Sequence, residues 1–253
     1  MSCAVMQKDL SIPPVEALKR AFRSVKCLTQ YDAVILANDA YGILVKHLSC
    51  EDAATLQGAL QAEGVQTEIV DERSLPTLPT TKFVHRLDCL PESLLIYDPL
   101  GRGFPLEWPH VMMVAAGRVR LEDTSQPRPH ATVTRHDLFG TAQPQLLADL
   151  GREGEGNHHL VLEIILTRAV LGYSATADKF NFQYLGDRKA AAESANFALL
   201  VRDPATFAPH AILNRGAQSL IQDAKEVFDY PSRNAFHEEI IWLLWRLAQG
   251  AAA

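Results

Sequence analysis

Residues 42–48 read GILVKHL, and this short, branched, apolar run is the clearest strand signal in the chain. Ser49 follows it, with Asp52 three residues further on, which is the spacing of a capping box at a helix start. Apolar residues then recur at helical spacing as far as Gly64, a residue type that commonly ends helices. Residues 65–70 alternate in polarity, as a second strand would. The stretch therefore predicts a β-α-β unit over 42–72.

Upstream of this unit, the chain has the signals of two helices. After a short polar tail, Pro13-Pro14 is typical of a helix entry, and a helical apolar spacing follows it. Thr29 with Asp32 forms a capping-box pattern that predicts a second helix ending near Asn38. Downstream, residues 74–81 contain two prolines without periodicity, which favours an extended linker. We therefore expect an N-terminal α/β module over 1–73 and a linker over 74–81.

The remaining chain, 82–253, is predicted to form a β-rich module with C-terminal helices. A period of two predicts strands, and the helical period returns near the end. The long segment 122–157 has three prolines and a glycine-rich end, and we expect it to be a disordered loop. Strands are expected at 83–87, 94–97, 111–119, 160–169 and 173–184, and helices at 188–202, 216–228 and 233–248.

The fold class that these elements predict is α+β. It would combine the N-terminal helices and β-α-β module, a β-rich middle module and a C-terminal helical layer. We expect the three C-terminal helices to cover one face or end of the middle sheet, because that sheet has apolar residues to bury and no other partner in the sequence.

Composition and charge limit the classes of function that the protein can have. The formal net charge is −6, which gives no support for nucleic-acid binding. No stretch approaches 18 consecutive apolar residues, so no membrane span is expected, and no signal peptide is recognisable. The cysteines lie far apart and without a CxxC pair, which predicts free thiols and a cytoplasmic location. They are Cys3, Cys27, Cys50 and Cys89.

Two segments resemble known domain families. Residues 43–73 carry Ile43-Leu-Val-Lys-His-Leu-Ser, the stripe Ala53, Leu56 and Leu60, Glu63-Gly-Val, and Ile69-Val-Asp-Glu. This pattern resembles the ferredoxin-like β-α-β of small bacterial signal-transducing domains. Residues 93–117 carry Leu94-Leu-Ile-Tyr-Asp, Gly101, Leu106-Glu-Trp, Val111, Val114 and Gly117. They are similar to part of a bacterial pleckstrin-homology-like domain. Both resemblances imply a regulatory or binding scaffold.

Motifs of catalysis are missing from the sequence. It has no GxxxxGK[ST] phosphate loop and no GxSxG nucleophile elbow. His237-Glu238 begins like a zinc-binding HExxH motif, but Ile241 stands where the second histidine is needed. We read this pair as part of a solvated helix face. Cys50 could have a lowered pKa at a helix N-terminus, although a buried, inert thiol is the favoured reading. No cofactor or metal site is predicted.

One histidine-rich region keeps an enzymatic alternative open. Imidazole and carboxylate groups together can bind a divalent ion or transfer protons. Exposed loop histidines are the favoured reading, since adjacent residues of a strand point to opposite faces. The alternative is a metal-assisted, hydrolase-like enzyme with a site on the loop 130–163. The residues concerned are His130, His136, Asp137, His158, His159 and Glu163.

Two surfaces are candidates for binding. Tyr97, Arg102 and Trp108 flank a predicted hairpin and could form an aromatic and cationic ligand-binding surface, although ordinary sheet packing is favoured. Trp242 and Trp245 belong to a helix that is apolar on more than one face. Core burial is favoured for them, but a protein partner or a second copy could also cover them. We expect a non-catalytic intracellular binding, adaptor or regulatory protein.

Overall fold

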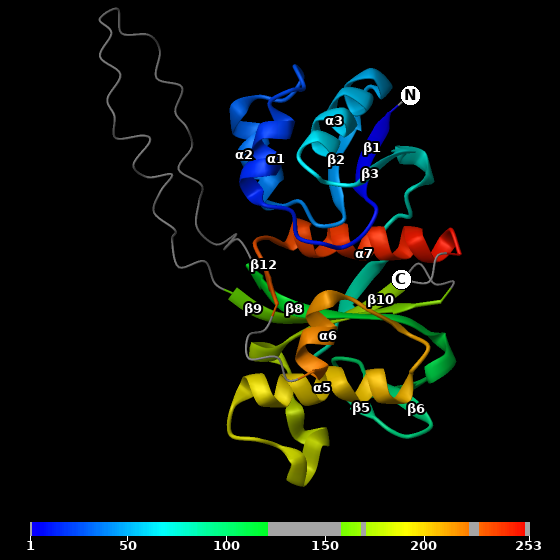
Figure 1. The fold of residues 1–253 in the computed structure, drawn as a ribbon. Coiled ribbons are helices and arrows are strands. Elements are labelled where there is room, and N and C mark those ends of the chain that lie inside the picture. The colour runs from blue at the N-terminus through cyan, green and yellow to red at the C-terminus, as the bar shows by residue number, and fades with distance from the viewer. Residues whose placement is uncertain (1, 121–157, 168–170, 223–227, 251–253) are drawn as a thin grey trace, which may run out of the picture.

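A computed structural model describes residues 2–120, 158–167, 171–222 and 228–250 (Figure 1). Its helices and strands form an α+β fold with three sheets among these residues, which confirms the predicted fold class. The expected loop 122–157 lies outside the described residues. Within the described residues, no helix is both long enough and apolar enough to cross a membrane.

The N-terminal module is a three-stranded sheet covered by helices. Its sheet has the order β2-β1-β3, and both outer strands run antiparallel to β1. The strands are β1 (Cys3–Gln7), β2 (Ile43–Leu48) and β3 (Thr67–Asp71), and the helices are α1 (Val15–Phe22), α2 (Gln30–Asn38) and α3 (Cys50–Ala62). The predicted β-α-β unit is therefore present as β2-α3-β3, with β1 inserted between its two strands.

Local signals explain the helix ends of this module. The Thr29 hydroxyl accepts from the Asp32 amide, and the Asp32 carboxylate accepts from the Thr29 amide, so the predicted capping box is confirmed. The Ser49 hydroxyl accepts from the Asp52 amide and so caps α3, but the Asp52 carboxylate accepts from that hydroxyl instead of the Ser49 amide, so the second predicted capping box is incomplete. The central strand β1 was missed, because residues 1–14 were read as a polar tail. All five of its residues are buried, and its apolar run Cys3-Ala-Val-Met was the available signal.

The middle module contains two sheets. The larger has the order β11-β8-β9-β10-β4, with β12 also pairing with β8. Its strands are β4 (Thr80–Phe83), β8 (Val111–Arg120), β9 (His158–Leu166), β10 (Leu171–Thr176), β11 (Ile212–Leu213) and β12 (Asp229–Tyr230). The smaller sheet has the order β5-β6-β7. Its strands are β5 (Leu87–Cys89), β6 (Ser93–Tyr97) and β7 (Gly103–Glu107).

Two strand predictions in this module need correction. The expected strand 83–87 is divided between β4 and β5, which belong to different sheets. The expected strand 173–184 ends at Thr176, and 3-10 turns at Ala177–Lys179 and Phe182–Arg188 follow it. Alternating polarity also occurs in short turns packed on a core, so the period of two extended the strand too far. Thr80 and Thr81, predicted as linker, already belong to β4.

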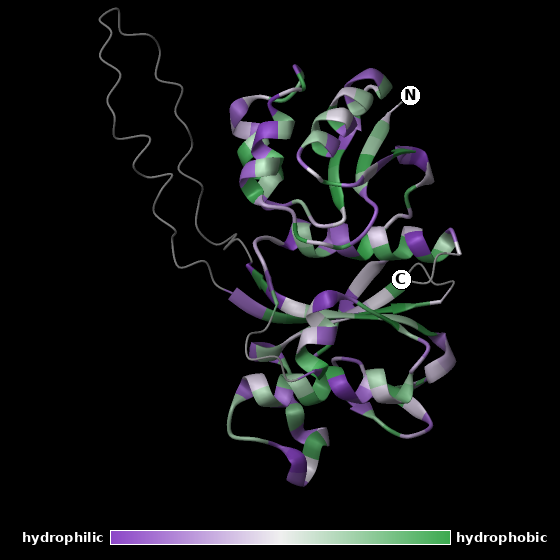
Figure 2. Cartoon of the chain, viewed as in Figure 1, coloured by the Kyte–Doolittle hydropathy of each residue, from purple (hydrophilic) through white to green (hydrophobic). Residues whose placement is uncertain are grey.

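The C-terminal helices lie on both faces of the larger sheet. They are α5 (Glu193–Phe207), α6 (Arg215–Ile221) and α7 (Arg233–Ala248). Figure 1 shows α7 between the N-terminal module and the larger sheet, whereas α5 and α6 lie on the opposite face. The expectation that all three cover one face is therefore wrong. The physical reason lies in strand β8, which is largely hydrophobic (Figure 2) and buries residues on both of its faces. Both faces of the sheet therefore need helices to cover them.

Three core clusters follow from this arrangement. One fills the N-terminal module beneath α1, α2 and α3, and a second lies between the larger sheet, the smaller sheet and α5. The third surrounds α7 and contains Met6 and Ile43 from the N-terminal sheet and Met113 and Ala115 from β8. Helix α7 is thus packed between two sheets.

One disulfide bond joins Cys3, at the start of β1, to Cys50, at the start of α3. This corrects both the prediction of free thiols and the reading of Cys50 as an inert thiol. Spacing along the sequence suggested no pairing because 47 residues separate the two. The strand order places them side by side. Cys27 and Cys89 are free cysteines.

Candidate functional site

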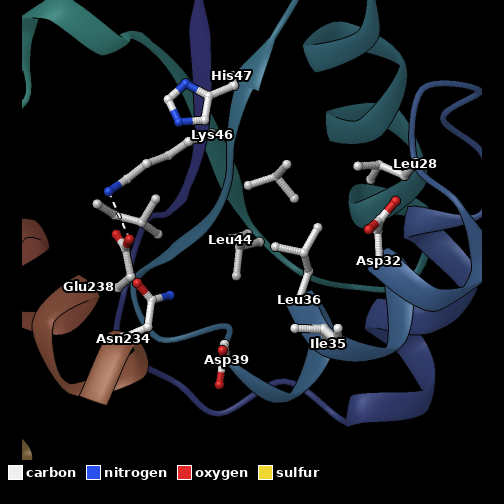
Figure 3. Close-up of a pocket in the computed structure, with 12 residues that line it drawn as sticks. Leu28, Asp32, Ile35, Leu36, Asp39, Leu44, Lys46, His47, Asn234 and Glu238 are labelled. Atoms are coloured by element: carbon white, nitrogen blue, oxygen red, sulfur yellow. Dashed lines mark hydrogen bonds and ion pairs between the residues drawn. The ribbon is translucent and has the colours of Figure 1, made fainter. Parts of the chain in front are cut away.

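A cavity of about 390 Å³ opens between α2, β2 and the first turns of α7. We call it the α2–β2–α7 cavity (Figure 3). Its apolar walls come from α2 and β2 together with the segment before α2, and its polar groups come from all three elements. The apolar lining consists of Leu28, Ile35, Leu36, Ile43, Leu44 and Val45, and the polar lining of Asp32, Asp39, Lys46, His47, Asn234 and Glu238.

Helix α2 presents one face to the cavity. Asp32, Ile35, Leu36 and Asp39 stand at positions i, i+3, i+4 and i+7, which share one side of a helix. The capping box at Thr29 fixes where this helix begins and therefore which side chains lie on that face. Both ends of the face are acidic, and its middle is apolar.

Strand β2 and helix α7 supply a partly buried ion pair. Lys46 follows the apolar run of β2, and its Nζ donates to Glu238 Oε1 at 2.8 Å. The Glu238 side chain is only 12% exposed. Burial raises the pKa of Glu238 above its ordinary value, although the hydrogen bond and charge of Lys46 act in the opposite direction. Asn234 lies one turn before Glu238 on the same side of α7.

One oxygen of this pair has no partner. Glu238 Oε2 is buried and accepts no hydrogen bond from any residue that the structure describes. A buried acceptor without a donor is costly, and native proteins rarely keep one without a reason. Figure 3 places the carboxylate beside Lys46 and Asn234, at the polar end of the cavity.

Asp39 joins α2 to the start of α7. The Ser232 hydroxyl donates to Asp39 Oδ1 at 2.8 Å, and the same hydroxyl accepts from the Ala235 amide at 3.0 Å. Ser232 is therefore the N-cap of α7 and also its link to the opposite wall of the cavity. His47 stands at the rim with a positive φ of 62°, and its Nδ1 lies 2.8 Å from Glu72 Oε1.

A buried polar cluster lies on the other side of α7. Glu239 is fully buried, and both its oxygens accept from Arg215. The Tyr230 hydroxyl donates to Glu239 Oε2 at 2.9 Å and accepts from Asn214 Nδ2 at the same distance. Burial raises the pKa of Tyr230 well above its usual range, and the Glu239 charge acts in the same direction. We call Asn214, Arg215, Tyr230 and Glu239 the α7 hub.

The α7 hub connects the two modules. Arg215 Nη1 donates to the Leu10 carbonyl at 2.8 Å, and its guanidinium lies over the rings of Tyr41 and Phe228. The Asn214 side chain bonds both the amide and the carbonyl of Ala116 in β8. These bonds satisfy the buried polar groups of the hub, so its evident role is structural.

The predicted ligand surface is not assembled. Arg102 and Trp108 flank opposite ends of β7, roughly 20 Å apart along the strand. Trp108 is 5% exposed, stacks on Phe207 and donates its indole N–H to the Leu90 carbonyl. This placement agrees with the alternative of ordinary sheet packing.

The polar members of that surface have other partners. Arg102 pairs with Asp98 within its own turn, at 2.7 Å. The guanidinium over the ring of Tyr97 belongs to Arg86, and the Tyr97 hydroxyl donates to Asp88. Tyr97 therefore contacts the Arg86–Asp88 ion pair, whereas Arg102 forms a separate ion pair with Asp98.

Where it is described, the histidine-rich region is divided: His158 and His159 line a cavity with Asp178, whereas Glu163 contacts His237. His130, His136 and Asp137 lie outside the described residues. His159 Nδ1 lies 3.5 Å from Asp178, whereas Glu163 is buried and its Oε1 lies 3.1 Å from His237 Nε2. Across residues 2–120, 158–167, 171–222 and 228–250, no group of three or more His, Cys, Asp and Glu side chains is arranged for a metal ion.

Helix α7 corrects one further reading and agrees with another. His237 and Glu238 do not form a solvated face, because each is partly buried and contacts a partner from another element, Glu163 and Lys46 respectively. Trp242 and Trp245 are 4% and 7% exposed and lie in the cluster between the two sheets. The N-terminal sheet covers them, as the favoured reading of core burial expects, and self-association or a protein partner at this helix stays a prediction.

Comparisons of the chain with models of known protein families, with curated proteins and with solved structures found no match. The two local resemblances therefore stay predictions. Sequence reasoning missed the residues that line the cavity, namely Asp32, Asp39, Lys46, Asn234 and Glu238. The helical spacing of the cavity residues on α2 can be read from the sequence. Nothing in the sequence shows that this face lies against α7, a helix that begins almost 200 residues later.

Proposed function

We propose that the protein is a non-catalytic binding protein of regulatory type, and that its ligand is a small molecule held in the α2–β2–α7 cavity. The observation that carries this proposal is the cavity itself, with about 390 Å³ of space, apolar walls and a few polar groups at its ends. Sites for small molecules commonly have this size and this division of polarity.

The location of the cavity supports a regulatory role. Two of its walls belong to the N-terminal module, and the third belongs to α7, which also packs on β8. A bound molecule would contact both sides of the junction. Glu238 faces the cavity while its neighbour Glu239 is held in the α7 hub. Binding would thus change the contacts of α7, the helix that packs between the two sheets.

The proposal is tested with the neutral fluorescent dye N-phenyl-1-naphthylamine, whose emission rises in apolar surroundings. We expect the wild-type protein to bind it saturably. Ile35→Trp should fill the mouth of the cavity and abolish this binding. Val34→Trp is the matched control, because Val34 is its neighbour on α2, is similarly exposed at 40% against 42%, and does not line the cavity.

Saturable binding that is lost only in Ile35→Trp supports the proposal. No saturable binding to the wild-type protein, or equal binding to both variants, overturns it. The metal-assisted hydrolase stays a prediction, since most of its loop lies outside the described residues. A metal content of one equivalent in the purified protein, measured by mass spectrometry, would favour that alternative.

A further inference from the structure

Consecutive residues of β2 line the α2–β2–α7 cavity, and they are Ile43, Leu44, Val45, Lys46 and His47. Successive residues of a strand point to opposite faces of a sheet. Ile43 accordingly belongs to the core cluster around α7, whereas Leu44 belongs to the cluster beneath α1, α2 and α3. A space that touches residues of both faces lies beside the edge of the strand. The cavity therefore follows the outer edge of β2.

This edge lies between two helices. In the part of the chain that the structure describes, the only strand paired with β2 is β1, because the sheet has the order β2-β1-β3. Helix α2 flanks the edge on the face that α1 and α3 also cover, and α7 flanks it on the other face. The cavity is thus a slot with the backbone of a strand along one side and a helix on each face.

The two helices give the slot different surfaces. The α2 side is apolar in its middle, where Leu28, Ile35 and Leu36 lie, and the α7 side is polar, with Asn234 and Glu238 (Figure 3). The charged lining groups already have partners within the protein, so an uncharged ligand meets no charge that it must balance. These contacts join Asp32 to Thr29, Asp39 to Ser232, Lys46 to Glu238 and His47 to Glu72.

We propose that the ligand is a short, uncharged peptide in an extended conformation, which adds to β2 as a further strand of the N-terminal sheet. This inference rests on the proposed function of the cavity. An edge strand presents backbone N–H and C=O groups to one side, and an extended chain is the ligand that complements them. Its side chains would point alternately to α2 and to α7. The preferred peptide therefore alternates apolar and polar residues.

The open part of the edge is short. At its start the Ile43 amide donates to the Tyr41 carbonyl at 2.9 Å, and at its end the His47 amide donates to Glu72 Oε2 at 3.2 Å. The positive φ of His47 and the register shifts between β1 and β2 bend the strand further. Residues 43–46 remain for pairing, which is roughly 13 Å of strand. A peptide of about five residues covers this length.

The probe is acetyl-Thr-Leu-Thr-Val-Thr-amide, and its control is acetyl-Leu-Val-Thr-Thr-Thr-amide, which has the same composition without the alternation. Displacement of the naphthylamine dye and titration calorimetry measure both affinities for the wild-type protein, and we expect the alternating peptide to bind more tightly. A single N-methyl group is then placed on each backbone amide in turn. Alternate amides of a strand point to the neighbouring strand. Methylation should therefore weaken binding by roughly tenfold or more at alternate positions, the cost of a lost buried hydrogen bond, and change it little at the others.

Two variants locate the peptide. Ile35→Trp should abolish its binding, and Val34→Trp, which does not change the cavity lining, should keep it. If the dye binds but neither peptide displaces it, or both peptides bind equally, or methylation weakens binding equally at every position, the peptide class is wrong and the cavity keeps its role for another small molecule. Peptide binding that survives in Ile35→Trp also overturns the inference. A dye that does not bind removes the proposed function first.

Discussion

Individual residues decide how closely the elements of this protein approach one another. Gly216, at the start of α6, leaves no room for a side chain, because a Cβ there would lie 1.9 Å from the Ala116 carbonyl oxygen of β8. Backbone atoms form this contact, so neither side can yield by changing a rotamer. The Asn214 bonds to Ala116 hold α6 at this distance. Glycine is therefore required beside the α7 hub.

We expect Gly216→Ala to destabilise the protein by about 3 kcal/mol or more, since α6 must move away from β8. Urea unfolding followed by circular dichroism measures the change. Gly58→Ala is the control, because nothing lies within 4 Å of a Cβ at that helical position. It should stabilise the protein by about 0.5–1 kcal/mol. Equal effects of the two substitutions would contradict the close approach of α6 and β8.

At the scale of elements, the start of α7 depends on Ser232, which caps the helix and holds Asp39 across the cavity. Ser232→Ala should cost about 1 kcal/mol of stability, as the loss of an N-cap commonly does, and should also weaken dye binding. Ser49→Ala removes the cap of α3, which does not line the cavity. It should cost a similar amount in a urea titration and leave the dye affinity unchanged. Loss of dye affinity in both variants would contradict this account.

The sequence predicts the elements whose signals lie within a few neighbouring residues. It does not predict the features that depend on contacts between residues far apart in the chain. The caps at Thr29 and Ser49, Gly64 and the helix 233–248 follow from residues within a few positions of each other. Strand β1 is short, and its pairing partners lie about 40 and 65 residues away. The cavity depends on contacts between α2 and α7, whose side chains are far apart in sequence. No local pattern could join Asp39 to Ser232.

At the scale of the whole molecule, the Cys3–Cys50 disulfide ties the first strand to the third helix. It closes a long loop, and a cross-link of this span stabilises a fold by about 4 kcal/mol in the chain-entropy model. We expect reduction, or Cys50→Ser, to lower the melting temperature clearly, while Cys27→Ser changes it little because Cys27 is free and exposed. Mass spectrometry of a non-reduced digest should find the linked peptides. An unlinked pair together with an unchanged melting temperature would contradict the bond.

The position of α7 between two sheets has a consequence for dividing the protein. A cut in residues 74–79 would separate the β-α-β module from the larger sheet, but it would not release two self-sufficient fragments. The first fragment would expose Met6 and Ile43 to water, and the second would expose Trp242 and Trp245. Each half thus carries an apolar surface that the other half covers, so we expect the two halves to be stable only together.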